Sequence, residues 1–156
     1  PEQQKVLLAS ADITTVLLQQ ESANTFSSFT SVKQDAQSFT LELGKVLPFG
    51  ANDLSRFSGI ELLLRAVISG EELPSRSAEG IEQFVVHHTL EKSSESWKFH
   101  LPDDAPNFSE CAPGSLIAED GSAQYLVGEE PEYIVFPNPR VKVGARAGLM
   151  LRKLSR

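Results

Sequence analysis

One acidic side chain, Glu42, stands inside the otherwise apolar alternation of residues 38–45, Ser-Phe-Thr-Leu-Glu-Leu-Gly-Lys. Every second residue is apolar, which predicts a strand over Phe39–Leu43. A carboxylate inside such a strand is costly unless something pairs with it. The strand ends directly after it, at Gly44, and open sheets commonly bind ligands at strand ends. Glu42 is therefore our first candidate for a general base that activates water. The alternative is a structural acid paired with a lysine or arginine.

Two further polar residues are candidates for binding a substrate. Lys45 lies three residues after the acid and could neutralise Glu42, bind an anionic substrate, or face water. Asn138 lies between Pro137 and Pro139. Prolines on both sides are typical of a rigid turn at a strand end. They could equally hold the amide at the rim of a site.

The residues that usually ligate metals are poorly placed in this sequence. His87 and His88 are adjacent, so in a regular strand they point to opposite faces and cannot both ligate one ion. His100 stands alone, and Cys111 is the only cysteine, which excludes a cysteine cluster and an internal disulfide. We therefore expect no metal site built from this chain alone.

Composition narrows the classes of function. The chain has 156 residues, 40% of them hydrophobic, and a net charge of −7. This acidic balance argues against nucleic acid or an anionic membrane as a general partner. No apolar run approaches the roughly 20 residues that span a bilayer, and we expect no signal peptide. Together with the single cysteine, these features predict a cytoplasmic protein.

The fold class predicted from the patterns is α/β followed by all-β. Residues 1–72 alternate helix and strand, which suggests a mainly parallel sheet. The elements expected there are a helix over Pro1–Ser10, a strand over Ile13–Leu18, a short helix capped by Thr25, the strand Phe39–Leu43, and a long helix that Asn52 or Asp53 caps and Gly70 ends.

Residues 73–156 lack helix signals and read as a small antiparallel β-domain. Short strand-like runs are separated by Pro, Gly, Asn and Asp; they lie at 84–86, 97–101, 115–117, 124–127, 133–136 and 149–151. Asp120-Gly121 is expected to form a two-residue hairpin turn. We expect the last strand to pack back on the first.

Two blocks of residues resemble a known family. Residues 40–54 read Thr-Leu-Glu-Leu-Gly-Lys-x-x-Pro-Phe-Gly-x-Asn-Asp-Leu, and residues 133–151 read Tyr-Ile-Val-Phe-Pro-Asn-Pro-x-Val-x-x-Gly-x-Arg-Ala-Gly-Leu-Met-Leu. Both resemble the C-terminal part of the succinylglutamate desuccinylase and aspartoacylase family, zinc hydrolases of carboxypeptidase-like fold. The resemblance implies hydrolysis of N-succinyl-L-glutamate to succinate and L-glutamate, the last step of arginine catabolism through the succinyltransferase route. It also implies that residues 1–72 are the C-terminal part of the α/β zinc-hydrolase domain.

The resemblance gives Glu42 the family's catalytic role, that of the base which takes a proton from zinc-bound water and returns it to the leaving amine. The family's zinc ligands lie in a His-Gly-Asn-Glu-like motif and an Asp-Leu-His-Thr-like motif, and neither occurs here. Both would lie upstream of Pro1. We therefore expect a C-terminal fragment that holds no Zn²⁺ and is inactive by itself. Its exposed strand edge would favour self-association.

The alternative function is a catalytically silent β-rich binding or assembly module. The surroundings of Glu42 separate the two readings. A catalytic base should open into a cleft and have a raised pKa, whereas a structural acid should be satisfied by a protein cation and closed off. A third reading, a metal-free hydrolase that pairs Glu42 with another acid such as Glu61, has little support.

Overall fold

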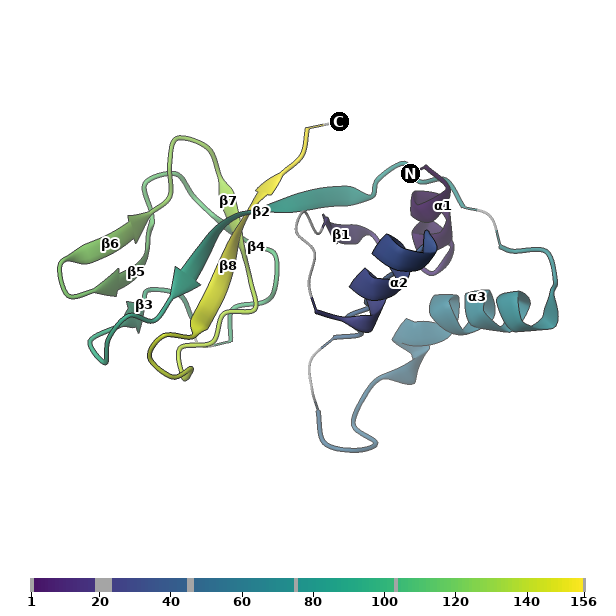
Figure 1. The fold of residues 1–156 in the computed structure, drawn as a ribbon, viewed down its shortest axis with the longest axis horizontal. Helices are drawn as coiled ribbons and strands as arrows, with labels where there is room; N and C mark the ends of the chain where they lie inside the picture. The colour runs from purple at the N-terminus through teal and green to yellow at the C-terminus, as the bar shows by residue number, and fades with distance from the viewer. Residues whose placement is uncertain (1, 19–23, 45–46, 75, 103, 156) are drawn as a thin grey trace. The chain divides into compact units, whose positions relative to one another are not determined.

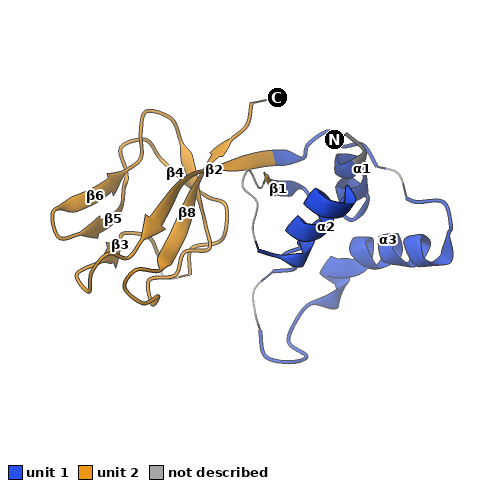
Figure 2. Ribbon diagram, in the orientation of Figure 1, with its two compact units in different colours: residues 1–16, 21–82 blue, residues 17–20, 83–156 orange. Residues whose placement is uncertain are grey.

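The chain folds into two compact units (Figure 2), one made of residues 1–16 and 21–82 and the other of residues 17–20 and 83–156. They are called unit 1 and unit 2 below. The structure, a computed structural model (Figure 1), describes residues 2–18, 24–44, 47–74, 76–102 and 104–155. The division after residue 72 remains a prediction as a domain boundary.

Unit 1 carries all the helices that the structure describes: α1 (Glu2–Ser10), α2 (Phe26–Gln34), the 3-10 helix η1 (Leu54–Phe57) and α3 (Ser58–Ser69). The predicted cap at Thr25 and the predicted helix end at Gly70 are confirmed, whereas Asp53 caps η1, and α3 itself begins at Ser58 without a side-chain cap. The hydroxyl of Thr25 accepts a hydrogen bond from the backbone of Ser28, and a carboxylate oxygen of Asp53 accepts one from the backbone of Ser55. Gly70 ends α3 in the left-handed conformation, with φ of 68°.

Helices α1 and α3 pack closely, and the residues at the contact are small. A Cβ atom added to Gly59 would lie 2.9 Å from the backbone carbon of Ala11, so only glycine fits there. Leu63 and Ala66, one and two turns further along α3, are buried on the same face.

The predicted strand over Phe39–Leu43 is wrong. This segment lies outside every helix and strand of the structure, and Phe39 and Leu43 are 40% and 46% exposed. A strand forms only when a neighbour accepts and donates its backbone hydrogen bonds, and no described residue pairs with this segment. The predicted mainly parallel sheet does not form within the described part of residues 1–72. Among described residues before 72, only β1 (Thr15–Leu18) is a strand, and it is half-buried rather than covered on both faces.

Unit 2 is antiparallel β-structure, as predicted. Its strands are β2 (Glu82–Glu91), β3 (Lys98–Phe99), β4 (Ser109–Cys111), β5 (Leu116–Asp120), β6 (Ala123–Leu126), β7 (Glu132–Val135) and β8 (Arg146–Lys153). One sheet has the order β1-β2-β8-β7-β4 and the other β3-β5-β6. The last strand, β8, pairs with β2.

Two details of unit 2 differ from the sequence prediction. Strand β4 was not predicted, because three residues are too few to show a pattern. The hairpin turn between β5 and β6 is displaced by one residue: Asp120 ends β5, and Gly121 and Ser122 form the turn. Gly121 has φ of 61°, the conformation that glycine adopts most readily.

Unit 2 has two clusters of buried residues, which lie on opposite faces of the sheet that contains β7 and β8, because their residues alternate along both strands. One cluster of buried residues consists of Leu90, Cys111, Ile117, Ala118, Val127, Ile134 and Met150, and a second of Phe84, Val135, Leu149 and Leu151. Within the described residues, no helix is long and apolar enough to cross a membrane.

Candidate functional site

Glu42 lies on an open segment of unit 1 and is exposed to solvent. No described residue donates a hydrogen bond or forms an ion pair with its carboxylate. The chain leading to it is held by α2, where the hydroxyls of Thr30 and Ser38 are 2.7 Å apart. Among the residues that the structure describes, Glu42 therefore lacks the cation expected of a structural acid, but it lines neither the pocket bordered by Phe99 nor the one bordered by Arg76, so the cleft expected around a base is not seen here.

The residues that follow Glu42 in the family-like block build turns and a helix start. Gly44 and Gly50 have φ of 102° and 81°, which residues with a side chain rarely adopt. The backbone N–H of Ala51 donates to Pro48 in a turn (2.9 Å). Asp53 then begins η1, and the hydroxyl and backbone N–H of Ser55 hold the pKa of Asp53 below its usual value. The residues of this block that follow Glu42 thus form the connection from Glu42 to η1 and α3.

The two predicted substrate-binding residues have different outcomes. Lys45 lies outside the described residues. Asn138 is exposed in the loop that follows β7, and its side-chain oxygen accepts a hydrogen bond from the backbone of Arg140 (3.0 Å). Its own backbone N–H donates to Ala147 (2.8 Å). Asn138 therefore stabilises a turn, which is the structural alternative, while its amide NH₂ group stays available.

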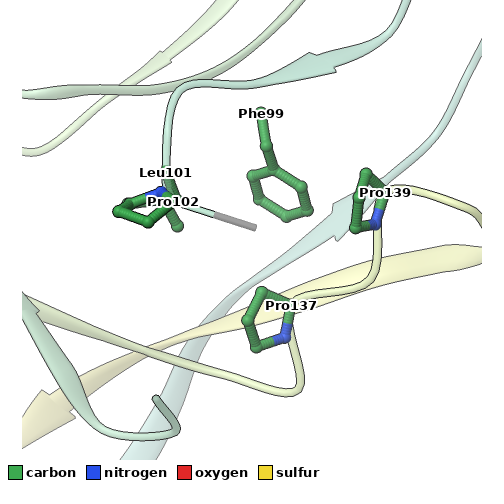
Figure 3. Close-up of a pocket in the computed structure, with 5 residues that line it drawn as sticks. All are labelled: Phe99, Leu101, Pro102, Pro137 and Pro139. Atoms are coloured by element: carbon green, nitrogen blue, oxygen red, sulfur yellow. The ribbon is translucent and has the colours of Figure 1, made fainter. Parts of the chain in front are cut away.

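The prolines on either side of Asn138 face a small pocket in unit 2 (Figure 3). Its walls are apolar and come from two segments of the chain: Phe99, Leu101, Pro102, Pro137 and Pro139. None of these side chains can donate or accept a proton. The pocket can pack an apolar group but offers no acid–base chemistry.

The two adjacent histidines do not alternate as predicted, because β2 contains a bulge. The register shifts between Val86 and His88, which leaves His87 as the extra residue. His87 lies 3.5 Å (Nε2 to Oε1) from Glu132, and His88 stacks on Tyr125 with ring centroids 4.7 Å apart. Both histidines consequently contact the same pair, since the Tyr125 hydroxyl donates to Glu132 (2.5 Å).

This pair joins a half-buried tyrosine to a buried carboxylate. Glu132 is only 3% exposed. Burial and the adjacent Glu132 carboxylate together raise the pKa of Tyr125 above its usual value. Burial, followed by the charges of Glu132 and Glu110, also raises the pKa of the Cys111 thiol. Both hydroxyl and thiol are thus kept protonated, which suits a structural role and not nucleophilic catalysis.

The described residues do not fit a zinc site. No group of three His, Cys, Asp or Glu side chains among them is arranged so that it could hold a metal ion. What this part of the chain can contribute to a hydrolytic site is the free carboxylate of Glu42.

Comparison with known proteins identifies the class to which this arrangement belongs. Residues 2–68 match the model of the succinylglutamate desuccinylase/aspartoacylase catalytic domain, and residues 79–154 match the AstE/AspA barrel-sandwich hybrid domain. The chain belongs to the succinylglutamate desuccinylase/aspartoacylase family.

The relatives within this family are similar over nearly the whole chain. The succinylglutamate desuccinylase of Serratia proteamaculans is 44% identical over 93% of this chain and 44% of its own length. That of Chromobacterium violaceum is 45% identical over 96% of this chain and 45% of its own. The crystal structure of the Vibrio cholerae succinylglutamate desuccinylase matches 97% of this chain and 44% of that one, with 32% identity and a TM-score of 0.86. The chain thus spans less than half the length of these relatives.

Proposed function

We propose that this chain forms part of a hydrolase that cleaves N-succinyl-L-glutamate to succinate and L-glutamate, with Glu42 as general base and general acid. The observation that carries the proposal is the place of Glu42. It lies within the stretch that matches the family's catalytic domain, it is exposed, and no described residue neutralises it.

The chemistry requires one proton carrier. The Glu42 carboxylate takes a proton from water while the water oxygen forms a bond to the amide carbonyl carbon. The carbon–nitrogen bond then breaks, and the proton on Glu42 passes to the departing amine of glutamate. One water is consumed, and succinate and glutamate are the products. The exposed carboxylate of Glu42, which no described cation neutralises, is available for this cycle.

The zinc ion that the family resemblance implies would lower the pKa of this water and polarise the carbonyl. The described residues hold no ligand set for it. We therefore propose that the carboxylate, and not the metal, is the contribution of this part of the enzyme, and that the 156-residue chain alone is inactive and retains no zinc.

The substrate carries three carboxylates, so cations and amide donors should bind it. We propose Lys45 as one cation, because it lies three residues beyond Glu42 in the sequence. For Asn138 we propose that the amide NH₂ group, which its turn leaves unused, contacts substrate. A cytoplasmic location, with neither nucleic acid nor membrane as partner, agrees with the net charge of −7.

The test is a chimera. The part of the C. violaceum succinylglutamate desuccinylase that this chain matches is replaced by this chain, and release of succinate from N-succinyl-L-glutamate is measured. We expect activity, and we expect Glu42→Gln to lower kcat by about 10²- to 10⁴-fold, as for loss of a general base.

The matched control is Glu61→Gln. Glu61 is an exposed acid on α3 whose Oε1 lies 2.8 Å from Arg65, so its amide variant should keep full activity. A folded chimera that is inactive would instead favour the β-rich binding module. Equal losses from Glu42→Gln and Glu61→Gln would remove Glu42 from its proposed role.

A further inference from the structure

Helix α3 carries an apolar stripe that the structure leaves open. It consists of Ile60, Leu64, Val67 and Ile68, and is called the α3 stripe below. The spacing i, i+4, i+7, i+8 is that of a helix face which packs on another element. Leu64, Val67 and Ile68 are nevertheless 52%, 55% and 84% exposed.

The α3 stripe is distinct from the face that packs in unit 1. That face consists of Gly59, Leu63 and Ala66, which are buried. A polar face follows on the far side, where Glu61 and Arg65 form an ion pair. Helix α3 therefore has two neighbouring apolar faces, and only one has a partner among the described residues.

Helix α2 also has an exposed apolar face. Its apolar residues Phe26, Phe29 and Val32 recur every three positions, and they are 81%, 55% and 63% exposed. None of the residues of α2 is buried. Large apolar residues gathered on surface helices in this way mark sites of interaction.

The segment around Glu42 lacks backbone hydrogen-bond partners among the described residues. Phe39–Leu43 has the period-two alternation of a strand but no described neighbour with which to form hydrogen bonds. Two helix faces and one strand-like segment of unit 1 thus all lack a partner among the described residues, although α3 itself is a complete helix that ends at Gly70.

The size of the relatives indicates what the partner is. This chain corresponds to 45% of the C. violaceum enzyme and 44% of the V. cholerae structure, so more than half of each relative lies outside the match. We propose that the α3 stripe and the apolar face of α2 dock that remaining part of a desuccinylase chain. This inference rests on the proposed function, and it names the body that completes the site.

Docking would also give the candidate base, Glu42, a defined position. A sheet in the remaining part that offers a free edge would supply the hydrogen bonds which Phe39–Leu43 lacks. Alternation would then place Thr40 and Glu42 on one face of the new strand, opposite its apolar residues. The base would thus take up a defined position only in the assembled protein.

The experiment compares two leucines of α3 in two contexts. Leu64 belongs to the α3 stripe, whereas Leu62 lies on another side of the helix and is similarly exposed, at 61% against 52%. Leu64→Asp and Leu62→Asp are made both in the 156-residue chain and in the chimera described above. Thermal unfolding midpoints are measured for all four variants and both parents.

We expect both changes to be nearly neutral in the chain alone, because both side chains are exposed there. In the chimera, Leu64→Asp should lower the midpoint by roughly 5 °C or more, since it buries a charge at the interface. Leu62→Asp should not. Ile68→Asp, at the most exposed position of the stripe, should behave like Leu64→Asp.

Three results would overturn the proposal: a chimera that does not fold, equal effects of the two leucine variants in the chimera, or a dimer of the 156-residue chain in sedimentation that Leu64→Asp dissociates. The last would make a second copy the partner. Activity is read separately through Glu42→Gln, so a chimera that is inactive but sensitive to Leu64→Asp would reject the function and keep the surface.

Discussion

The two units bury their apolar residues very differently. In unit 2, Ile134, Met150 and Leu151 are completely buried. In unit 1, the large apolar side chains of α2, of the 39–50 segment and of α3 are mostly exposed; Phe49 and Ile68 are the extremes. The helices of unit 1 and the strands of unit 2 nonetheless follow their sequence patterns equally well.

The difference shows that good local structure and a closed core are separate properties. Caps and turns need only a few neighbours in sequence, so α2 and α3 can form with little tertiary support. Burial of apolar area is the main stabilising contribution, and unit 1 obtains little of it. We infer that unit 2 is the stable part of this chain and that unit 1 depends on a partner.

The largest expected effect comes from truncating one leucine in each unit. Leu151→Ala removes a fully buried side chain and should cost about 2–5 kcal/mol of unfolding free energy. Leu64→Ala, on the exposed stripe, should change it by about 0.5 kcal/mol or less. Trp97, the only tryptophan, reports unit 2 by fluorescence in a denaturant titration, while circular dichroism reports the helices of unit 1.

Similar losses of unfolding free energy for the two leucines would contradict the difference in burial between the units. The same titration of the unchanged chain tests that difference further. The helical signal should be lost at lower denaturant concentration than the Trp97 signal, and a single coincident transition would contradict two units of different stability.

A smaller effect is expected where unit 2 buries a polar group. Tyr125→Phe removes the hydrogen bond to the buried Glu132 and should cost about 1–3 kcal/mol, because a buried acceptor loses its partner. The matched control is Tyr133→Phe, whose hydroxyl donates to the exposed Glu110, where water can replace it. Equal losses measured through Trp97 would show that burial of Glu132 is unimportant.

Each unit also contains an aspartate that serine hydroxyls hold below its usual pKa. Asp120 in unit 2 accepts hydrogen bonds from the hydroxyls of Ser93, Ser94 and Ser96, and Asp53 in unit 1 from Ser55 alone. A carboxylate whose folded pKa is lowered stabilises the protein above the unfolded pKa of about 3.9 and loses this contribution as the pH falls towards the folded pKa.

Acid should therefore act on both units, and on unit 2 the change should begin near pH 4 and continue well below it. Asp120→Asn should lower the stability of unit 2 at neutral pH and flatten its acid dependence. Denaturation midpoints from Trp97 fluorescence between neutral pH and about pH 3 measure this. A variant with an unchanged acid slope would remove Asp120 as the cause.

The smallest expected effect is kinetic and concerns the single thiol. Cys111 is 4% exposed, and burial raises its pKa, so a thiol reagent should react slowly with the folded chain. The rate should follow unfolding of unit 2 and stay unchanged when mild denaturant removes the helical signal of unit 1. Rapid reaction of the native chain would show that the core of unit 2 opens easily.

The predictions that succeeded depend on local chemistry. The helix caps at Thr25 and Asp53, the end of α3 at Gly70 and six strands of unit 2 follow from residues close together in the chain. The family assignment likewise came from two contiguous blocks. The strand over Phe39–Leu43 failed because a strand also needs a neighbour, which its own residues cannot supply.

The prediction that His87 and His88 point to opposite faces of a strand failed for a related reason. Regular alternation would separate His87 from His88, yet the register between β2 and β8 shifts at that point and brings both to the Tyr125–Glu132 pair. A register shift is set by how two strands fit against each other, and it leaves no mark on one strand's pattern.

The residues alone therefore establish the family, most of the helices and strands, and Glu42 as the candidate base, because these depend on contiguous motifs, spacing and short-range contacts. The folded chain decides which apolar faces are buried, what surrounds each polar side chain, and that Glu42 lies on an open segment and not in a strand. Those properties depend on contacts between residues far apart in sequence. Such contacts form only when the fold brings a pairing strand or a packing surface next to the residue concerned.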